Sequence, residues 1–129
     1  MSISYKKSKT LDPKQIYSLY KSANWINKGD TGKFLVDSYK NSDIVFSAWD
    51  GKKLVGVIRA LTDKKMDGVI FGLVVRKEYQ KKGIGKKLTL KVLDMYPKVR
   101  WYLGTTNKNK GFYKKVGFTL DKDPWFKKI

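Results

Sequence analysis

The stretch VIFGLVV (residues 69–75) is apolar at every position except Gly72. A run that is apolar on both faces is typical of a strand buried in the middle of a sheet. Glycine inside such a strand indicates a bulge or a close approach of the backbone to another group. After a short charged segment come Gly83 and Gly85, and apolar residues then recur every fourth position until the next proline. We therefore predict a buried strand, a glycine turn and a helix over about residues 83–96.

The glycine turn has features that suit an anion. Glycine lets the backbone approach a ligand closely, and the free N–H groups and the dipole of the following helix favour negative charge. Four lysines surround the turn, at Lys81, Lys82, Lys86 and Lys87. A solvated basic turn is the alternative interpretation, because a short glycine motif is a weak indication by itself.

Two known phosphate-binding motifs do not fit this turn. A Walker loop requires Ser or Thr after its Gly-Lys pair, but Gly85-Lys86 is followed by Lys87. The dinucleotide-binding pattern Gly-x-Gly-x-x-Gly requires a third glycine, and Leu88 stands in that place. Nucleotide hydrolysis and hydride transfer therefore have no support here.

The rest of the chain predicts helices and strands around this unit. Asp12-Pro13 is a typical helix start, and the helix that follows is expected to end near Trp25. A second helix is indicated by the spacing of Phe34, Leu35 and Tyr39. Further strands are expected over residues 44–49 and 53–61, joined by a hairpin turn at Asp50-Gly51, over residues 99–103, and from Phe118 after a short helix over residues 110–116.

Length and composition limit the class of protein. At 129 residues, the chain fits one domain spanning residues 1–129. It contains no cysteine and no histidine, which excludes disulfides, a cysteine nucleophile and a Ser-His-Asp arrangement, and we expect no metal site. Because the N-terminal segment lacks the apolar core of a signal peptide and no run approaches the roughly 20 apolar residues of a membrane span, we expect a cytoplasmic protein without a membrane partner.

The net charge of +18 raises the question of nucleic acid, since clustered cations bind phosphate backbones by releasing counterions. Only three of the 29 basic residues are arginines, however, at Arg59, Arg76 and Arg100. Base readout and bidentate phosphate recognition favour the planar fork of arginine. The codon usage of an AT-rich genome would equally explain the lysine excess, so the charge alone assigns no partner.

Two segments carry a resemblance to a known family. VVRKEYQKKGIGKKL (residues 74–88) closely resembles the Gln/Arg-x-x-Gly-x-Gly/Ala acetyl-CoA signature of the GNAT N-acetyltransferase superfamily. NKNKGFYKKVGF (residues 107–118) is similar to a second motif of that superfamily, here Asn107, Phe112, Tyr113, Gly117 and Phe118. The motifs occur in the family's order, with a helix and a strand between them.

The resemblance implies an α+β fold of three layers, the GNAT-like acyl-CoA N-acyltransferase fold. Its sheet is mixed and mostly antiparallel, is flanked by helices, and contains a parallel strand pair that splays apart to admit acetyl-CoA. The backbone of the bulged strand would pair with the pantetheine arm, and the glycine turn would hold the pyrophosphate. The cofactor-binding residues implied in this way are Leu73, Val74, Val75, Gln80, Lys81, Lys82, Gly83, Ile84, Gly85, Lys86, Asn107 and Tyr113. Lys81 departs from the family pattern, where glycine is common.

The resemblance also implies that Tyr113 is catalytic. It matches the family's tyrosine whose hydroxyl faces the thioester sulfur, where a phenol can protonate the departing thiolate as a general acid. Simple packing beside Phe112 is the alternative role for this ring. A backbone N–H near Val74 would stabilise the oxyanion.

The general base is not assigned by the resemblance. Relatives often carry a carboxylate roughly where this chain has Gly72. Asp63, Asp67 and Glu78 are near in sequence, although acidic residues in turns are usually only solvated. An ordered water, or an amine that arrives already neutral, would serve instead of a carboxylate.

We therefore predict an acetyl-CoA-dependent N-acetyltransferase that acts on a primary amine of a small, unidentified acceptor by direct transfer in a ternary complex. A basic nucleic-acid-binding module and an acyl-CoA-binding sensor without turnover are the alternatives. The positive field favours an acceptor with a carboxylate or phosphate over a polyamine. Trp25, Trp49 and Trp101 line an acceptor pocket or belong to the core, and the apolar Trp125-Phe126 pair suits docking on a second subunit, which would make a homodimer.

Overall fold

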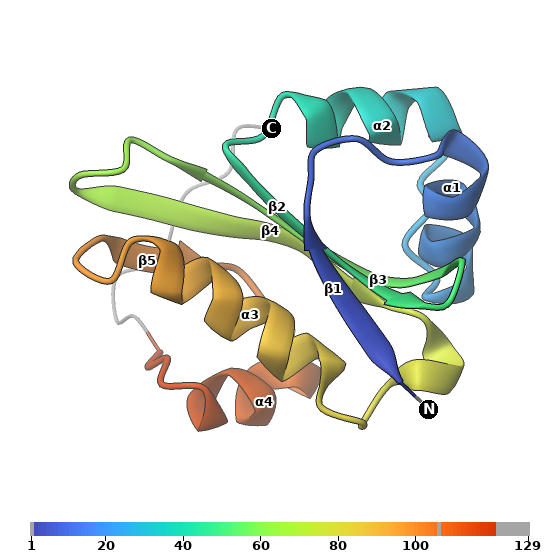
Figure 1. The fold of residues 1–129 in the computed structure, drawn as a ribbon. Coiled ribbons are helices and arrows are strands. Elements are labelled where there is room, and N and C mark those ends of the chain that lie inside the picture. The colour runs from blue at the N-terminus through green and yellow to red at the C-terminus, as the bar shows by residue number, and fades with distance from the viewer. Residues whose placement is uncertain (1, 106, 121–129) are drawn as a thin grey trace.

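The computed structural model describes residues 2–105 and 107–120. Figure 1 shows a twisted sheet with helices packed around it. The strands of this part of the chain are β1 (Ile3–Lys7), β2 (Ile44–Asp50), β3 (Lys53–Thr62), β4 (Asp67–Val75) and β5 (Arg100–Leu103). The helices are α1 (Pro13–Ser22), α2 (Gly32–Lys40), α3 (Ile84–Met95) and α4 (Lys110–Lys115), with short 3-10 turns η1 (Lys77–Tyr79) and η2 (Asn107–Asn109).

The strands lie in one sheet in their order along the chain, β1-β2-β3-β4-β5. Each strand from β1 to β4 is antiparallel to its neighbour, whereas β4 and β5 are parallel. Parallel strands need a crossover connection, and α3 provides it. The mixed, mostly antiparallel sheet confirms the predicted α+β fold, including the parallel pair.

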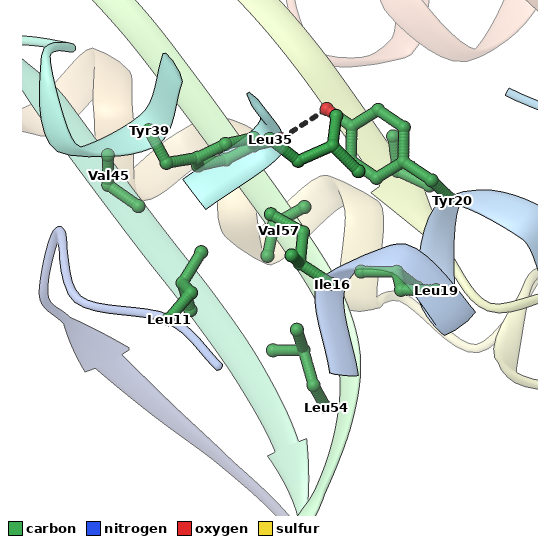
Figure 2. Close-up of a cluster of buried hydrophobic side chains, with 10 residues drawn as sticks. Leu11, Ile16, Leu19, Tyr20, Leu35, Tyr39, Val45, Leu54 and Val57 are labelled. Carbon is green, nitrogen blue, oxygen red and sulfur yellow. Dashed lines mark hydrogen bonds between the residues drawn. The ribbon is translucent and has the colours of Figure 1, made fainter. Parts of the chain in front are cut away.

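Two apolar clusters cover opposite faces of the sheet, because successive side chains of a strand point to opposite faces. On one face, Val45 and Val57 pack against the apolar sides of α1 and α2, as Figure 2 shows. On the other face, Phe46 and Ile58 pack against α3. The sheet is therefore the middle layer of three.

The first helix begins as predicted and ends slightly earlier. The Asp12 carboxylate accepts a hydrogen bond from the Gln15 N–H at 3.0 Å, which caps α1 before its first proline. At the other end, Asn24 adopts a left-handed conformation with φ 62°, and the Trp25 N–H donates to the Tyr20 carbonyl at 2.9 Å. This Schellman-type closure stops the helix at Ser22 rather than near Trp25.

A bulge interrupts β4 at the glycine that breaks its apolar run. Val57 pairs with Val74 and Arg59 pairs with Phe71, so β4 contains one more residue than β3 over this interval. Gly72 takes up the extra length with φ 62°. The predicted bulge is confirmed.

β4 and β5 are paired over the first four of the nine residues of β4. Their register runs from Asp67 opposite Arg100 to Ile70 opposite Leu103, where β5 ends. From Phe71 onward, the edge of β4 on this side has no paired strand within the described residues. The strand pair thus opens at the bulge.

Two strand predictions need correction. β1 was missed because ISYKK carries three polar residues out of five and forms an edge strand in which only Ile3 and Tyr5 are half-buried. The strand predicted from Phe118 is not formed by residues 118–120, which continue from the turn after α4 without strand pairing. The rest of that prediction, and the Trp125-Phe126 pair, lie outside the described residues. Within the described ranges, no helix is both long and apolar enough to cross a membrane.

Candidate functional site

The glycine turn before α3 leaves a row of amide groups free. Lys81 has φ 64°, and Gly83, the N-cap residue of α3, has φ 87°. The first helical hydrogen bond runs from the Lys87 N–H to the Gly83 carbonyl at 3.1 Å. In the described part of the chain, the N–H groups of residues 81–86 donate to no other protein group. These donors lie at the positive end of the helix dipole, where an anion is favoured.

The space in front of this turn is open. A Cβ atom built on Gly83 would meet no heavy atom within 4 Å. Lys81, Lys82 and Lys86 are exposed and form no ion pair with any described carboxylate. Lys87 instead extends toward β1, with its Nζ 4.8 Å from the centre of the Tyr5 ring. The charges of Lys81, Lys82 and Lys86 are therefore not neutralised by a described carboxylate.

The side chains of two predicted cofactor-binding residues, Gln80 and Ile84, have structural roles. The Gln80 Nε2 donates to the Val75 carbonyl at 2.9 Å, which fastens the turn to the end of β4. Ile84 is buried in the α3-face cluster, where its Cγ2 would lie 3.2 Å from a Cβ atom on Gly56. Ile84 can therefore meet a ligand only through its backbone.

Three distant segments meet beside Gly85. A Cβ atom on Gly85 would lie 3.5 Å from the Phe112 ring of α4 and 3.8 Å from the Leu73 Cδ2 of the bulge. Leu73 and Val75 pack against the α3-face cluster, whereas the Val74 side chain is buried on the α1/α2 face. The glycine turn, the open edge of β4 and the second family motif thus border one region.

Tyr113 lies in α4, next to this region. Its ring packs edge-on against Phe112 and Phe118, with ring centres 5.0 and 5.9 Å away. Burial raises the pKa of the Tyr113 hydroxyl above its ordinary value. Within the described residues, this hydroxyl forms no hydrogen bond. Asn107 is the first residue of η2, and its side chain lies outside the described part of the structure.

The bulge at Gly72 is surrounded by tyrosine hydroxyls. The Tyr39 hydroxyl donates to the Gly72 carbonyl at 3.0 Å and lies 2.7 Å from the Tyr20 hydroxyl. A Cβ atom on Gly72 would come within 2.8 Å of the Tyr39 oxygen and 3.0 Å of the Tyr20 oxygen. Burial, and secondarily the Tyr20 hydroxyl, hold the pKa of Tyr39 well above its ordinary value. The hydroxyl pair thus fills the space that a side chain at position 72 would need.

The sequence missed this tyrosine pair. The spacing of Tyr20 and Tyr39 with neighbouring apolar residues indicated only the buried sides of two helices. The sequence did place a tyrosine on the buried side of each helix, and a buried tyrosine hydroxyl requires a hydrogen-bond partner. That partner, the Gly72 carbonyl, is 33 residues away from Tyr39 along the chain.

The three acidic residues considered as general bases have other partners. Asp63 accepts hydrogen bonds from the N–H groups of Lys65 and Met66, which lower the pKa of its carboxyl group and make it a weaker base. Asp67 pairs with Arg100 at 3.0 Å, and Glu78 with Lys53 at 3.7 Å. The structure supports none of them as the base.

The three tryptophans do not share one pocket. Trp49 packs beside the α1/α2-face cluster and Trp101 beside the α3-face cluster, while Trp25 is 50% exposed. Trp101 also lines a cavity of about 570 Å³ between α3, β5 and the segment after α4, with Leu93 and residues 116–120. None of the residues of the glycine turn borders that cavity.

Known proteins share both the sequence pattern and the fold. An uncharacterized N-acetyltransferase of Bacillus subtilis, YvbK, is 31% identical over an alignment of 97 positions, which covers 70% of this chain and 63% of that protein. The match thus spans less than two thirds of the relative's length. A GNAT-family acetyltransferase from Streptococcus pneumoniae superposes with a TM-score of 0.77 at 26% identity, covering 99% of this chain and 100% of that one.

The fold is also that of an enzyme with a more distant sequence. Glucosamine-6-phosphate N-acetyltransferase from Arabidopsis thaliana superposes with a TM-score of 0.72 at 17% identity, covering 99% of both chains. Residues 41–120, more than half of the chain and including both motifs, match the acetyltransferase (GNAT) domain. The chain therefore belongs to the GNAT family of acetyltransferases.

Proposed function

We propose that this protein transfers an acetyl group from acetyl-CoA to the primary amine of a small acceptor, by direct attack in a ternary complex. The observation that carries the proposal is the row of free amides at residues 81–86 beside the unpaired edge of β4. The free amides suit the pyrophosphate of acetyl-CoA, and the unpaired strand edge suits its amide-containing pantetheine arm. Both occur where the two family motifs meet.

The residues present fit such a donor. The N–H groups of residues 81–86 would bind the pyrophosphate, with Lys81, Lys82 and Lys86 adding positive charge. The open backbone edge at Leu73, Val74 and Val75 would pair with the pantetheine arm in the manner of an added strand. Only the backbone takes part there, so the apolar side chains remain in the core.

Acetyl-CoA supplies a thioester carbonyl that is activated toward amines. As the carbon–nitrogen bond forms and the carbon–sulfur bond breaks, the nitrogen loses a proton and the sulfur gains one. A backbone N–H near Val74 would stabilise the oxyanion, and Tyr113 would donate the proton to the thiolate. Tyr113 suits this role because its raised pKa keeps the hydroxyl protonated at neutral pH. Because Asp63, Asp67 and Glu78 are engaged by other partners, the amine would lose its proton to water.

A turnover assay tests this proposal. Purified protein is incubated with acetyl-CoA and a panel of small amines at near-physiological salt, and released CoA thiol is measured together with the acetylated amine. We expect stoichiometric formation of both products with at least one amine. Binding of acetyl-CoA without any product would instead indicate an acyl-CoA sensor.

The basic nucleic-acid-binding alternative is tested in the same buffer. Affinity for a mixed-sequence DNA duplex would fall steeply as salt rises, because it depends on released counterions. Acetyl-CoA binding through amide groups should persist over the same salt range. Tight DNA binding combined with no binding of acetyl-CoA would contradict the enzymatic proposal.

A further inference from the structure

We propose that Arg59 binds an anionic group of the acceptor, a carboxylate or a phosphate, and thereby determines which amines the protein uses. This inference rests on the acetyl transfer proposed above. It assigns a specificity-determining role to a residue of β3 that belongs to neither family motif.

Arg59 is held in place by aromatic rings on the α1/α2 face of the sheet. Its Cα is paired with that of Phe71 in β4, the residue before Gly72. The guanidinium carbon lies 5.2 Å from the centre of the Phe71 ring and 5.9 Å from that of the Tyr39 ring. Cation–π contacts of this kind attract the guanidinium to the two rings without using its N–H donors.

Most of the N–H donors of Arg59 have no protein partner within the described residues. Its hydrogen bond to the Ser42 Oγ is long, at 3.4 Å, and no described carboxylate pairs with it. The other arginines differ in this respect. Arg76 donates to the Leu54 carbonyl at 3.1 and 3.3 Å, and Arg100 pairs with Asp67. Arg59 is therefore the half-buried arginine with donors to spare in the described part of the chain.

The bulge connects this cluster to the acetyl-donor side of the sheet. Leu73 packs on the α3 face near Gly85, whereas the preceding Gly72 is held by Tyr39 on the α1/α2 face. The parallel strand pair opens at the same point, since β5 is not paired beyond Ile70. An amine whose anionic group is bound by Arg59 would thus lie beside the bulge and next to the tyrosine hydroxyls, because the Arg59 Cγ would be 3.5 Å from a Cβ atom on Gly72.

The tyrosine pair adds an acceptor for the amine itself. Because the Tyr39 hydroxyl donates to the Gly72 carbonyl, the bond between the two hydroxyls must be donated by Tyr20. The Tyr20 oxygen, which donates to Tyr39, then keeps a lone pair that can accept an N–H group. The cluster therefore offers an acceptor for nitrogen and a guanidinium for an anion, which is the pattern of a small amine with an acidic group.

Guanidinium groups recognise carboxylates and phosphates through paired hydrogen bonds, and the two sources can be separated by experiment. Initial rates are measured at saturating acetyl-CoA with β-alanine, phosphoethanolamine and the uncharged propanolamine. The variants are Arg59→Gln, which removes the charge, and Arg59→Lys, which keeps it. Arg100→Gln is the matched control, because it removes the same charge from an exposed ion pair elsewhere. Thermal unfolding is recorded for each variant.

For the wild type we expect a higher kcat/KM with one of the anionic amines than with propanolamine. Arg59→Gln should lower kcat/KM for that amine about 10- to 100-fold and leave propanolamine unchanged, because one charged hydrogen-bonding group is lost. The kcat/KM of Arg59→Lys should lie between those of the wild type and Arg59→Gln, and the kcat/KM of Arg100→Gln should match the wild type. The anionic amine whose kcat/KM falls more shows whether Arg59 binds a carboxylate or a phosphate.

Three results would overturn the inference. An Arg59→Gln variant that loses activity equally with all three amines would show a structural role. Unchanged activity of Arg59→Gln and Arg59→Lys with both anionic amines would exclude any contact with the acceptor. A wild-type protein that binds acetyl-CoA but acetylates none of the amines would contradict the proposed transfer itself, and this inference with it.

Discussion

At the scale of single residues, the proposed chemistry depends on one hydroxyl. Tyr113 is packed by Phe112 and Phe118 through its ring, so its position does not depend on hydrogen bonding by its oxygen. That oxygen is therefore available to a substrate. The packing role and the catalytic role, between which the sequence did not decide, are compatible in the structure.

Replacement of the hydroxyl should separate these roles. In Tyr113→Phe, the ring and its packing remain, so acetyl-CoA should bind as in the wild type. We expect kcat to fall about 10²-fold or more, which is the usual contribution of a general acid. Calorimetry and steady-state rates measure the two quantities, and Tyr96→Phe serves as a control because that hydroxyl also forms no hydrogen bond within the described residues. Wild-type turnover in Tyr113→Phe would assign proton donation to another group.

The pH dependence of turnover follows from the raised pKa of Tyr113. A general acid works only while it is protonated, and burial moves the loss of this proton above its ordinary value of 10.0. We therefore expect kcat to show no decline through this group below about pH 10. Profiles of kcat against pH for the wild type and Tyr113→Phe test this. A decline centred near pH 8 that disappears in Tyr113→Phe would contradict it.

At the scale of elements, β4 is shaped by a contact from α2. The bulge places Gly72 in a left-handed conformation. The Tyr39 hydroxyl, from α2, donates a hydrogen bond to the Gly72 carbonyl. Because Tyr39 is 0% exposed, its hydroxyl has no water to replace these partners. The geometry of the proposed donor site thus depends on a helix that contributes no residue to it.

Removal of the two hydroxyls should have unequal effects. Tyr39→Phe leaves the Gly72 carbonyl and the Tyr20 hydroxyl without their partner, and should lower the free energy of unfolding by about 1–3 kcal/mol. Tyr20→Phe removes a single bond and should cost about 1 kcal/mol. Denaturant unfolding of both variants and of the double variant measures their coupling. Costs that simply add would contradict the shared hydrogen-bond chain.

At the scale of the whole molecule, local patterns predicted most elements. The Asp12-Pro13 start, the Asp50-Gly51 turn and the glycine in β4 have short-range causes, so the sequence identified them. β1 was missed because an edge strand with lysines lacks a strong apolar pattern.

The candidate site was predicted only where a motif marks it. Residues 81–86 are consecutive, so their free amides follow from the start of one helix. By contrast, Arg59, Tyr20 and Tyr39 come from three separate elements and meet only through packing across a layer. No residue spacing in the sequence indicates such a contact, which is why these residues were not among the predicted site residues.

The central claim, that the glycine turn binds acetyl-CoA, is tested most directly by calorimetric titration at near-physiological salt. Gly83→Glu places bulk and negative charge in the turn, whereas Gly29→Glu makes the same change at a glycine of similar φ, 90° against 87°, that also has open space around it. We predict saturable one-to-one binding to the wild type and to Gly29→Glu, and no measurable binding to Gly83→Glu. Equal binding to all three, or no binding to the wild type, would contradict the claim.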